Sequence, residues 1–171
     1  MMTAATYRDV TLADAAMIAD LFARTFVETF GHLYVKQDLD HFLAGVTPEA
    51  FAEEIARPAF ALRVAEVDAV PVAFAKIGPP DLPIETPHGT QELRQIYVLK
   101  PWQGEGIAQH LYDWAEAEAR RRGGAHLQLT VYVDNHRARR FYDRRGFVEV
   151  GRYDFMVGNH ADEDIIMRKP L

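Results

Sequence analysis

The sequence predicts an α/β fold in which helices flank a mixed β-sheet. Residues 91–99, 104–122 and 127–133 have the patterns of a strand, a long amphipathic helix and a second strand, as in two parallel strands joined by a crossover helix. Residues 60–66 and 70–77 are rich in Val, Phe and Ala and flank a short turn, which is typical of an antiparallel hairpin. Both kinds of strand pair in one chain predict a mixed sheet.

The composition is that of an ordinary globular chain and disfavours several kinds of partner. The 171 residues are 49% hydrophobic and 26% charged, which predicts one domain over residues 1–171 with a sizeable core. The formal net charge of −6 has the wrong sign for a protein that binds nucleic-acid phosphates. Charged residues interrupt the first 20 positions, and about 18 apolar residues never run together. We therefore expect a cytoplasmic protein with no nucleic-acid or membrane partner.

Two missing residue types limit the chemistry. The chain has no Cys and no Ser, which excludes disulfides, Cys-rich zinc modules and a Cys or Ser nucleophile. Its seven His residues are scattered and form no His-Glu-x-x-His pattern. No metal site is predicted.

One strand and three helices are predicted before the hairpin. Residues 6–10 are a strand candidate, and Thr11 can cap the helix that follows. Apolar residues then recur every four positions until Gly31, which predicts a helix with a wide apolar stripe. The stripe consists of Ile18, Phe22, Phe26 and Phe30, with Leu21 beside it. Two shorter helices are expected over residues 37–43 and 47–55.

The elements after the hairpin complete the sheet. The Pro-rich residues 78–89 predict a loop. The helix over 104–122 has Ile107, Leu111, Ala115 and Ala119 on one face. Another helix is expected over 135–145, where it ends at a glycine, and closing strands are expected over 147–151 and 164–168.

The segment from Val98 to Ala108 joins a predicted strand to the long helix and contains Gly104 and Gly106. Glycine lets the backbone approach a ligand closely, and the first amides of a helix are free donors at the positive end of its dipole. A phosphate could bind there, and a plain glycine-capped turn is the alternative. Gln109 stands where a dinucleotide-binding loop needs its third glycine, and no Walker motif follows.

This segment resembles the phosphate loop of the GNAT superfamily of acyl-CoA-dependent N-acetyltransferases, which reads Gln or Arg, x, x, Gly, x, Gly or Ala. Gln103, Gly106 and Ala108 match that pattern. A second family motif follows at the right separation, with Asn135, Ala138, Phe141-Tyr142 and Gly146-Phe147. The predicted order of elements agrees over essentially the whole chain. The resemblance implies a GNAT-like fold whose central sheet is splayed between two parallel strands.

The resemblance implies that acetyl-CoA is the co-substrate and lies in the splay. Its pyrophosphate would bind the loop amides, which are those of Gln103, Gly104, Glu105, Gly106, Ile107 and Ala108. Its pantetheine arm would pair with Ile96, Tyr97 and Val98, because a splayed strand has free N–H and C=O groups that an extended amide can satisfy. Asn135 matches a residue that contacts the cofactor in the family, and it is also a suitable helix N-cap.

The resemblance further implies direct attack of an amine on the thioester. Tyr142 matches the family's general acid, since a tyrosine with a pKa of about 10 can protonate a thiolate whose conjugate acid has a pKa of roughly 8.5. A packing role is the alternative for Tyr142. Glu92 stands where one branch of the family has its general base, and a water relay is the alternative. The tetrahedral oxyanion would meet a backbone N–H, that of Val98.

The acceptor is expected to bind near the first helices. Residues 26–55 are acidic, and Lys36 is the one Lys or Arg among them, so this surface would attract a polycation. The acidic residues are Glu28, Asp38, Asp40, Glu49, Glu53 and Glu54. In the sequence segments 28–34, 92–98 and 155–171, the chain resembles the bacterial spermidine/spermine acetyltransferase branch. Other small-molecule or peptide amines stay open, as do a catalytically silent acyl-CoA sensor and a generic nucleotide-phosphate binder. An exposed apolar C-terminal strand could mediate a homodimer.

Overall fold

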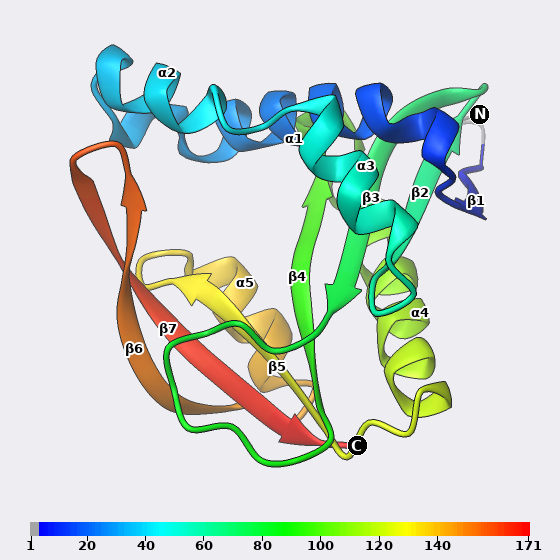
Figure 1. Cartoon of the computed structure of the whole chain (residues 1–171), viewed down its shortest axis with the longest axis vertical. Coiled ribbons are helices and arrows are strands. Elements are labelled where there is room, and N and C mark those ends of the chain that lie inside the picture. Colours follow the sequence, from blue (N-terminus) through cyan, green and yellow to red (C-terminus); the bar gives the residue numbers. More distant parts are fainter. Residues whose placement is uncertain (1–3) are drawn as a thin grey trace.

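A seven-stranded sheet organises the computed structural model, which describes residues 4–171 (Figure 1). The strand order is β1-β2-β3-β4-β5-β7-β6, and all neighbours are antiparallel except β4 and β5, which are parallel. The strands are β1 (Thr6–Asp9), β2 (Ala61–Val67), β3 (Val70–Gly78), β4 (Thr90–Val98), β5 (His126–Tyr132), β6 (Val148–Val157) and β7 (His160–Pro170). The predicted mixed sheet is confirmed.

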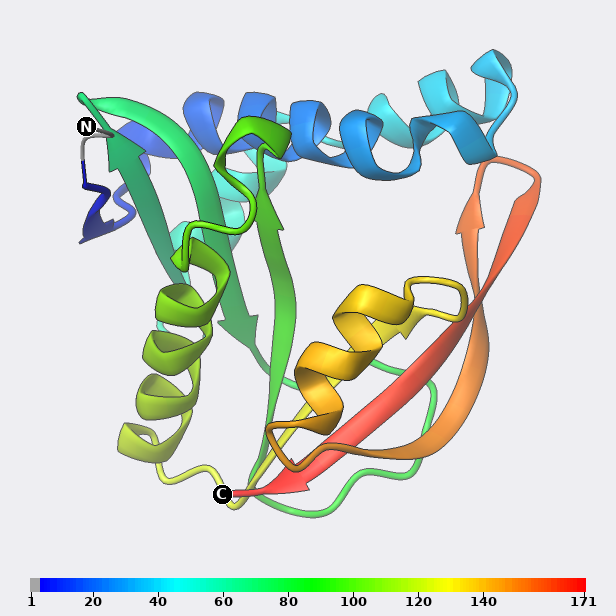
Figure 2. The same ribbon diagram turned by 180° about the vertical axis from the view of Figure 1, so that it is seen from behind.

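Helices cover both faces of the sheet (Figure 2). They are α1 (Ala15–Phe30), α2 (Lys36–Leu43), α3 (Pro48–Ala56), α4 (Ile107–Arg121) and α5 (His136–Asp143). The first three share a core with Leu62, Val64 and Phe74 on one face of β2 and β3. The last two pack on the opposite face, α4 along β3 and β4 and α5 beside β5. Within residues 4–171, no helix is long and apolar enough to cross a membrane.

The first helix follows the predicted apolar stripe. Ile18, Phe22 and Phe26 are buried, and Phe30 is partly buried at the end of the same face. The helix starts with a 3-10 turn at Leu12–Asp14, where the Asp14 carboxylate accepts a hydrogen bond from the Thr11 N–H at 2.8 Å. Thr11 therefore begins the helical segment, and α-helical geometry follows from Ala15.

The long helix begins later than the sequence predicts, at Ile107 rather than Gly104. Gly104 and Gly106 have φ angles of 85° and 82°, a left-handed conformation that does not continue into a right-handed helix. The face of α4 that the sequence predicts to be apolar is buried. Leu111 and Ala115 are fully inaccessible, and Ile107 is 4% exposed.

The closing hairpin is longer than the strands predicted over 147–151 and 164–168. Strand β6 has 10 residues and β7 has 11. At its tip, the Asn159 N–H donates to Asp38 Oδ1 of α2 at 3.0 Å. In β7 the first buried positions are Asp162 and Asp164, so the apolar alternation of a half-buried strand is missing from the start of this strand.

Strands β4 and β5 pair over a short stretch and then diverge (Figure 1). Residues 90–92 of β4 lie opposite residues 126–128 of β5, after which β4 follows β3 and β5 follows β7. The register between β3 and β4 also shifts at Lys76/Ile77. Within the described residues, the facing edges of β4 and β5 have no strand partner beyond these pairs. The predicted splay is confirmed.

Candidate functional site

The loop between β4 and α4 forms an open cradle of backbone amides. A Cβ atom on Gly104 or Gly106 would meet no other atom within 4 Å. The first turn of α4 follows directly, so its free N–H groups and the positive end of its dipole lie beside this space. Gln103 ties the loop to β4, since its Nε2 donates to the Val98 carbonyl at 3.1 Å. These donors suit a phosphate-sized anion.

Asn135 starts the helix that carries Tyr142. Its Oδ1 accepts a hydrogen bond from the Ala138 N–H at 3.2 Å, which confirms the predicted N-cap. About two turns later, Tyr142 packs edge-on against Phe141 and Phe147, with ring centroids 5.2 and 5.5 Å apart. The cap and the aromatic contacts together fix the position of the phenol.

Burial raises the pKa of the Tyr142 phenol to about 12, and the Arg145 guanidinium acts in the opposite direction. The phenol is therefore protonated at neutral pH. A protonated phenol can donate a hydrogen bond or a proton to an anion that forms beside it.

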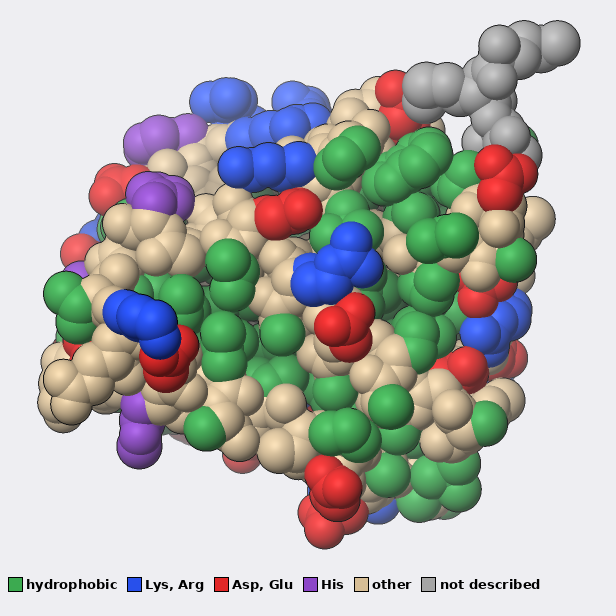
Figure 3. All heavy atoms as spheres, turned by 90° about the horizontal axis from the view of Figure 1, so that it is seen from above, with side chains coloured by type: hydrophobic (Ala, Val, Ile, Leu, Met, Phe, Trp, Pro, Cys, Tyr) green, Lys and Arg blue, Asp and Glu red, His purple; other side chains and the backbone are tan. Residues whose placement is uncertain are grey.

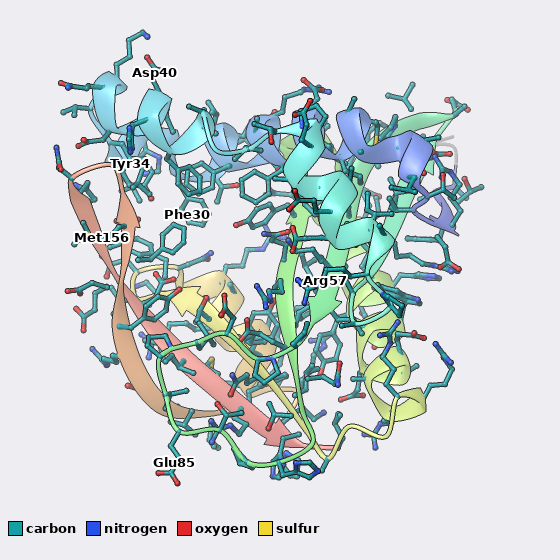
Figure 4. The ribbon with its side chains drawn as sticks, in the orientation of Figure 1. Phe30, Tyr34, Asp40, Arg57, Glu85 and Met156 are labelled. Atoms are coloured by element: carbon teal, nitrogen blue, oxygen red, sulfur yellow. The ribbon has the colours of Figure 1, made fainter. Side chains whose placement is uncertain are left out.

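A cavity of about 520 Å³ lies at the splay and is lined by both diverging strands. Residues 92–97 of β4, residues 129–132 of β5, and Tyr142 form part of its wall. Aromatic side chains of the helical layer and of β6 form another part, namely Phe22, Phe26, Phe30, Tyr34, Phe42 and Phe155. Figure 4 shows Phe30 and Tyr34 between the helical layer and the β6–β7 hairpin. Aromatic faces of this kind hold aliphatic chains and cations.

Ile96, Tyr97 and Val98 pair with β3 along one edge, and their other edge faces the splay. The Tyr97 ring packs against Phe22 at 5.3 Å between centroids. Burial raises the pKa of Tyr97, and the charges of Asp164 and Tyr142 raise it further. Tyr97 therefore lies within electrostatic range of both groups.

Glu92 is 4% exposed, and both of its carboxylate oxygens are engaged. Its Oε1 accepts hydrogen bonds from the Asp81 N–H at 3.2 Å and from Gln128 Nε2 at 3.1 Å. Arg94 Nε lies 3.1 Å from Oε2. Glu92 thus joins β4, β5 and the loop after β3 at the point where the parallel pairing ends.

Within residues 4–171, no group of three or more His, Cys, Asp or Glu residues is placed to hold a metal ion.

Sequence reasoning missed two carboxylates that line the cavity from β7. Asp162 and Asp164 are 5% and 8% exposed. Asp162 accepts a hydrogen bond from the Tyr34 hydroxyl, and His160 Nε2 lies 3.1 Å from its other oxygen. The signal in the sequence is the alternation of Asp162, Glu163 and Asp164 before an apolar run, which places both Asp residues on one face of a strand.

Several acidic residues of the first helices have structural partners. Glu54 accepts hydrogen bonds from the buried Lys76 at 2.9 Å, while Asp38 and Glu28 each accept one from backbone N–H groups. Asp40 lies on the outer side of α2, away from the cavity (Figure 4). Seen from above, acidic and basic side chains are interspersed on this face of the molecule (Figure 3). The acidic character of the cavity comes instead from the sheet and the loop after β3.

The chain thus combines a splayed sheet, an open loop of backbone amides at the start of a crossover helix and a buried phenol beside the splay. Residues 15–147 match the model of the acetyltransferase (GNAT) family, and the chain therefore belongs to this family of acyl-CoA-dependent N-acetyltransferases.

Similar proteins agree with this assignment. The chain is 29% identical over 161 residues to an uncharacterised N-acetyltransferase of Mycobacterium tuberculosis, covering 94% of this chain and 99% of the relative. It is 29% identical over 150 residues to one from the pepI 3′ region of Lactobacillus delbrueckii subsp. lactis, covering 86% of each. The crystal structure of PaiA N-acetyltransferase from Thermoplasma acidophilum in complex with coenzyme A has the same fold. Its TM-score is 0.78 at 18% identity, over 98% of this chain and 99% of that one.

Proposed function

We propose that this protein transfers an acetyl group from acetyl-CoA directly to a primary amine bound in the cavity at the splay. One observation carries the proposal: the protonated phenol of Tyr142 lines a cavity that also contains the open part of β4 and acidic and aromatic side chains. In this proposal donor and acceptor meet at the Tyr142 phenol.

The donor site combines the loop cradle with the open edge of β4. The amides of residues 103–108 would bind the pyrophosphate, since a Cβ at Gly104 or Gly106 would point into empty space. The backbone of residues 96–98 would pair with the pantetheine arm as an added strand does. Asn135 uses Oδ1 for its cap, which leaves its amide nitrogen for the donor.

Tyr142 acts as the general acid in this proposal. A thiolate develops as acetyl leaves sulfur, and its conjugate acid has a pKa of roughly 8.5 if a cysteine thiol is taken as the reference. The phenol is protonated at neutral pH and can stabilise or protonate this thiolate. The Val98 N–H is the proposed partner of the tetrahedral oxyanion.

The attacking amine must first lose a proton. An alkylamine of pKa about 10.4 is only about 0.04% neutral at pH 7, which corresponds to roughly 4.6 kcal/mol. The prediction that Glu92 removes this proton stays a prediction. Its engagement by Arg94, Gln128 and the Asp81 amide favours a role in holding the splay together.

A polyamine such as spermidine is the proposed acceptor. Among residues 4–171, four carboxylates and the guanidinium of Arg94 line the cavity, together with aromatic faces. The carboxylates are those of Asp81, Glu92, Asp162 and Asp164. Such a wall favours a ligand with more than one ammonium group over an amino acid, whose carboxylate would be repelled. We place the reaction in the cytoplasm as part of the same proposal.

The test is thiol release from acetyl-CoA by the purified protein with spermidine, spermine, a lysine-containing peptide, an amino acid and an aminoglycoside. Turnover with the polyamines above the other amines supports the proposal. Turnover with another class alone contradicts the polyamine assignment. Silence across the panel contradicts the proposed activity toward these amines.

Tyr142→Phe removes the proton donor and keeps most of the ring packing. We expect turnover to fall by a factor of roughly 10² to 10⁴, the usual range for general acid catalysis, with acetyl-CoA affinity nearly unchanged. Steady-state kinetics and calorimetric titration with acetyl-CoA measure the two quantities. Unchanged turnover would remove Tyr142 from the mechanism.

A further inference from the structure

Asp164 is a buried carboxylate whose surroundings differ from those of the other acids in the cavity. Within residues 4–171 it forms no ion pair, and the Thr130 hydroxyl acts to lower its pKa. Glu92 faces Arg94 at 3.1 Å, and Asp162 is held by Tyr34 and His160. Asp164 is thus free to accept a proton from a ligand.

The sheet places Asp164 near the reacting groups. On β7 it lies in register with Tyr132 of β5 on one side and Tyr153 of β6 on the other. It lines the same cavity as Tyr97 and Tyr142, and both Asp164 and Tyr142 lie within electrostatic range of Tyr97. The carboxylate and the general acid therefore lie around the same part of the cavity.

We infer that Asp164 is the general base that binds the acceptor's ammonium group and removes its proton before attack. The inference rests on the proposed acetyl transfer and names a base that the sequence motifs do not indicate.

The charged and titratable groups around Asp164 support this role. Burial raises the pKa of Asp164 to about 7, and the charge of Asp162 acts in the same direction. The groups that share the cavity with it from other elements are acids and phenols, together with the guanidinium of Arg94, which pairs with Glu92; the acids and phenols are Tyr34, Glu92, Tyr97, Tyr132, Tyr142 and Tyr153. A base whose pKa lies near neutral pH is ionised often enough to act and basic enough to take a proton.

The proposed reaction releases one proton for each acetyl group transferred. The ammonium R–NH₃⁺ gives one proton to Asp164, which later releases it to solvent. The neutral amine forms a C–N bond to the thioester carbon, and the carbonyl oxygen becomes an oxyanion. As the intermediate collapses, the C–S bond breaks, the thiolate takes the phenol proton of Tyr142, and the nitrogen loses its second proton, which restores the phenol. The products are the N-acetylated amine, coenzyme A and one released proton.

Asp164→Asn is the direct test, with acetyl-CoA and spermidine as substrates. We expect kcat/KM at pH 7 to fall by a factor of roughly 10² to 10⁴, and the loss to shrink as pH rises toward the amine pKa of about 10.4. Affinity for acetyl-CoA should stay within about twofold, which also shows that the variant is folded. Glu163→Gln is the matched control, because the neighbouring Glu163 is exposed and pairs with Arg152; its profile should match wild type.

Several kinetic outcomes would overturn the inference. An Asp164→Asn enzyme with wild-type rates excludes Asp164, and a loss that is equal at every pH assigns it to binding or packing alone. Rescue at high pH in Glu92→Gln but not in Asp164→Asn would return the base to Glu92. Failure of wild type with every amine of the panel would instead overturn the proposed function.

A second measurement decides on Asp164 without turnover. NMR titration of ¹³C-labelled Asp side chains, assigned with Asp164→Asn, should give a midpoint near pH 7 for Asp164. Asp162→Asn removes the neighbouring negative charge, so the midpoint should move to lower pH. A midpoint below pH 5 in wild type overturns the inference.

Discussion

Glu92 and Asp164 are buried acids of one cavity, and their contacts give them different tasks. Glu92 pairs with the guanidinium of Arg94 and accepts hydrogen bonds from the Gln128 side-chain amide and the Asp81 N–H. Its negative charge is therefore balanced within the protein. Asp164 lies beside another carboxylate and several phenols, so its ionised form is destabilised. These contacts favour a structural role for Glu92 where the sheet opens and leave Asp164 as the proposed base.

The raised pKa of Asp164 makes stability depend on pH. Its folded pKa of about 7 exceeds the ordinary value of 3.8 for an aspartate, so the protonated carboxyl contributes stability at low pH that is lost as pH rises through about 7. Asp164→Asn removes this dependence. We expect the variant to gain roughly 2 to 3 kcal/mol relative to wild type between pH 5 and pH 8, measured by urea unfolding at both values. Glu163→Gln should give a small difference that is equal at both values, and a constant offset for Asp164→Asn would contradict the prediction.

Sequence alone locates the residues that belong to local motifs. Asn135 was predicted as a cap because a helix start is encoded within four residues, and its bond to Ala138 confirms that role. Asp164 could not be recognised in the same way. It becomes a cavity residue through pairing with Tyr132 and Tyr153, which are 32 and 11 positions away in sequence (164 minus 132, and 164 minus 153).

At the scale of elements, the tip of the β6–β7 hairpin connects the sheet to the helical layer. Gly158 has a φ of 58°, and a Cβ there would lie 2.6 Å from the Asp38 Cα. The next residue donates its N–H to Asp38. This contact joins α2 to the strand pair that carries Asp162 and Asp164, so it helps fix the wall of the cavity that these residues form.

Gly158→Ala should separate the tip from α2. The left-handed φ and the backbone clash together predict a loss of roughly 1 to 3 kcal/mol in unfolding free energy, with a raised KM for the amine and little change for acetyl-CoA. Denaturant unfolding and kinetics measure both effects. Gly123→Ala is the matched control, because its φ is 78° but a Cβ there meets no atom within 4 Å. An equal cost for the two variants would mean that the contact with α2 contributes little.

The element pattern was predictable where one face of an element is continuously apolar. The stripe of α1 and the buried face of α4 followed from spacing, because each belongs to a continuous apolar cluster. The full length of β6 and β7 did not, since these strands face solvent and a polar cavity. The predicted start of α4 at Gly104 lies before the observed start at Ile107, because the left-handed conformations of Gly104 and Gly106 cannot be inferred from composition.

At the scale of the molecule, the sheet consists of two parts, β1 to β4 and β5 to β7, joined by the parallel pairing of residues 90–92 with residues 126–128. Glu92 and Gln128 form the last of these pairs and are also linked by a side-chain hydrogen bond at 3.1 Å. Most of the facing edges of β4 and β5 is left for a ligand.

Binding of acetyl-CoA should reduce amide hydrogen exchange at this opening. We expect protection to increase at residues 96–98 and in the loop at 103–108, with little change in β1 and β2, because the donor would satisfy groups that are open in the free protein. Exchange measured by mass spectrometry with and without acetyl-CoA tests this. Protection confined to the loop would show that the pantetheine arm does not pair with β4.

We expect the opening between the two halves to link the protein's lifetime to the supply of acetyl-CoA. A donor bound between β4 and β5 would bind the folded chain and not the unfolded one, and at 100 times its Kd it would add about 2.7 kcal/mol to stability. When acetyl-CoA is scarce, the unfolded fraction rises by the corresponding factor, roughly a hundredfold, and proteases gain access to it. The abundance of this protein in a cell would then follow the supply of the molecule that it consumes.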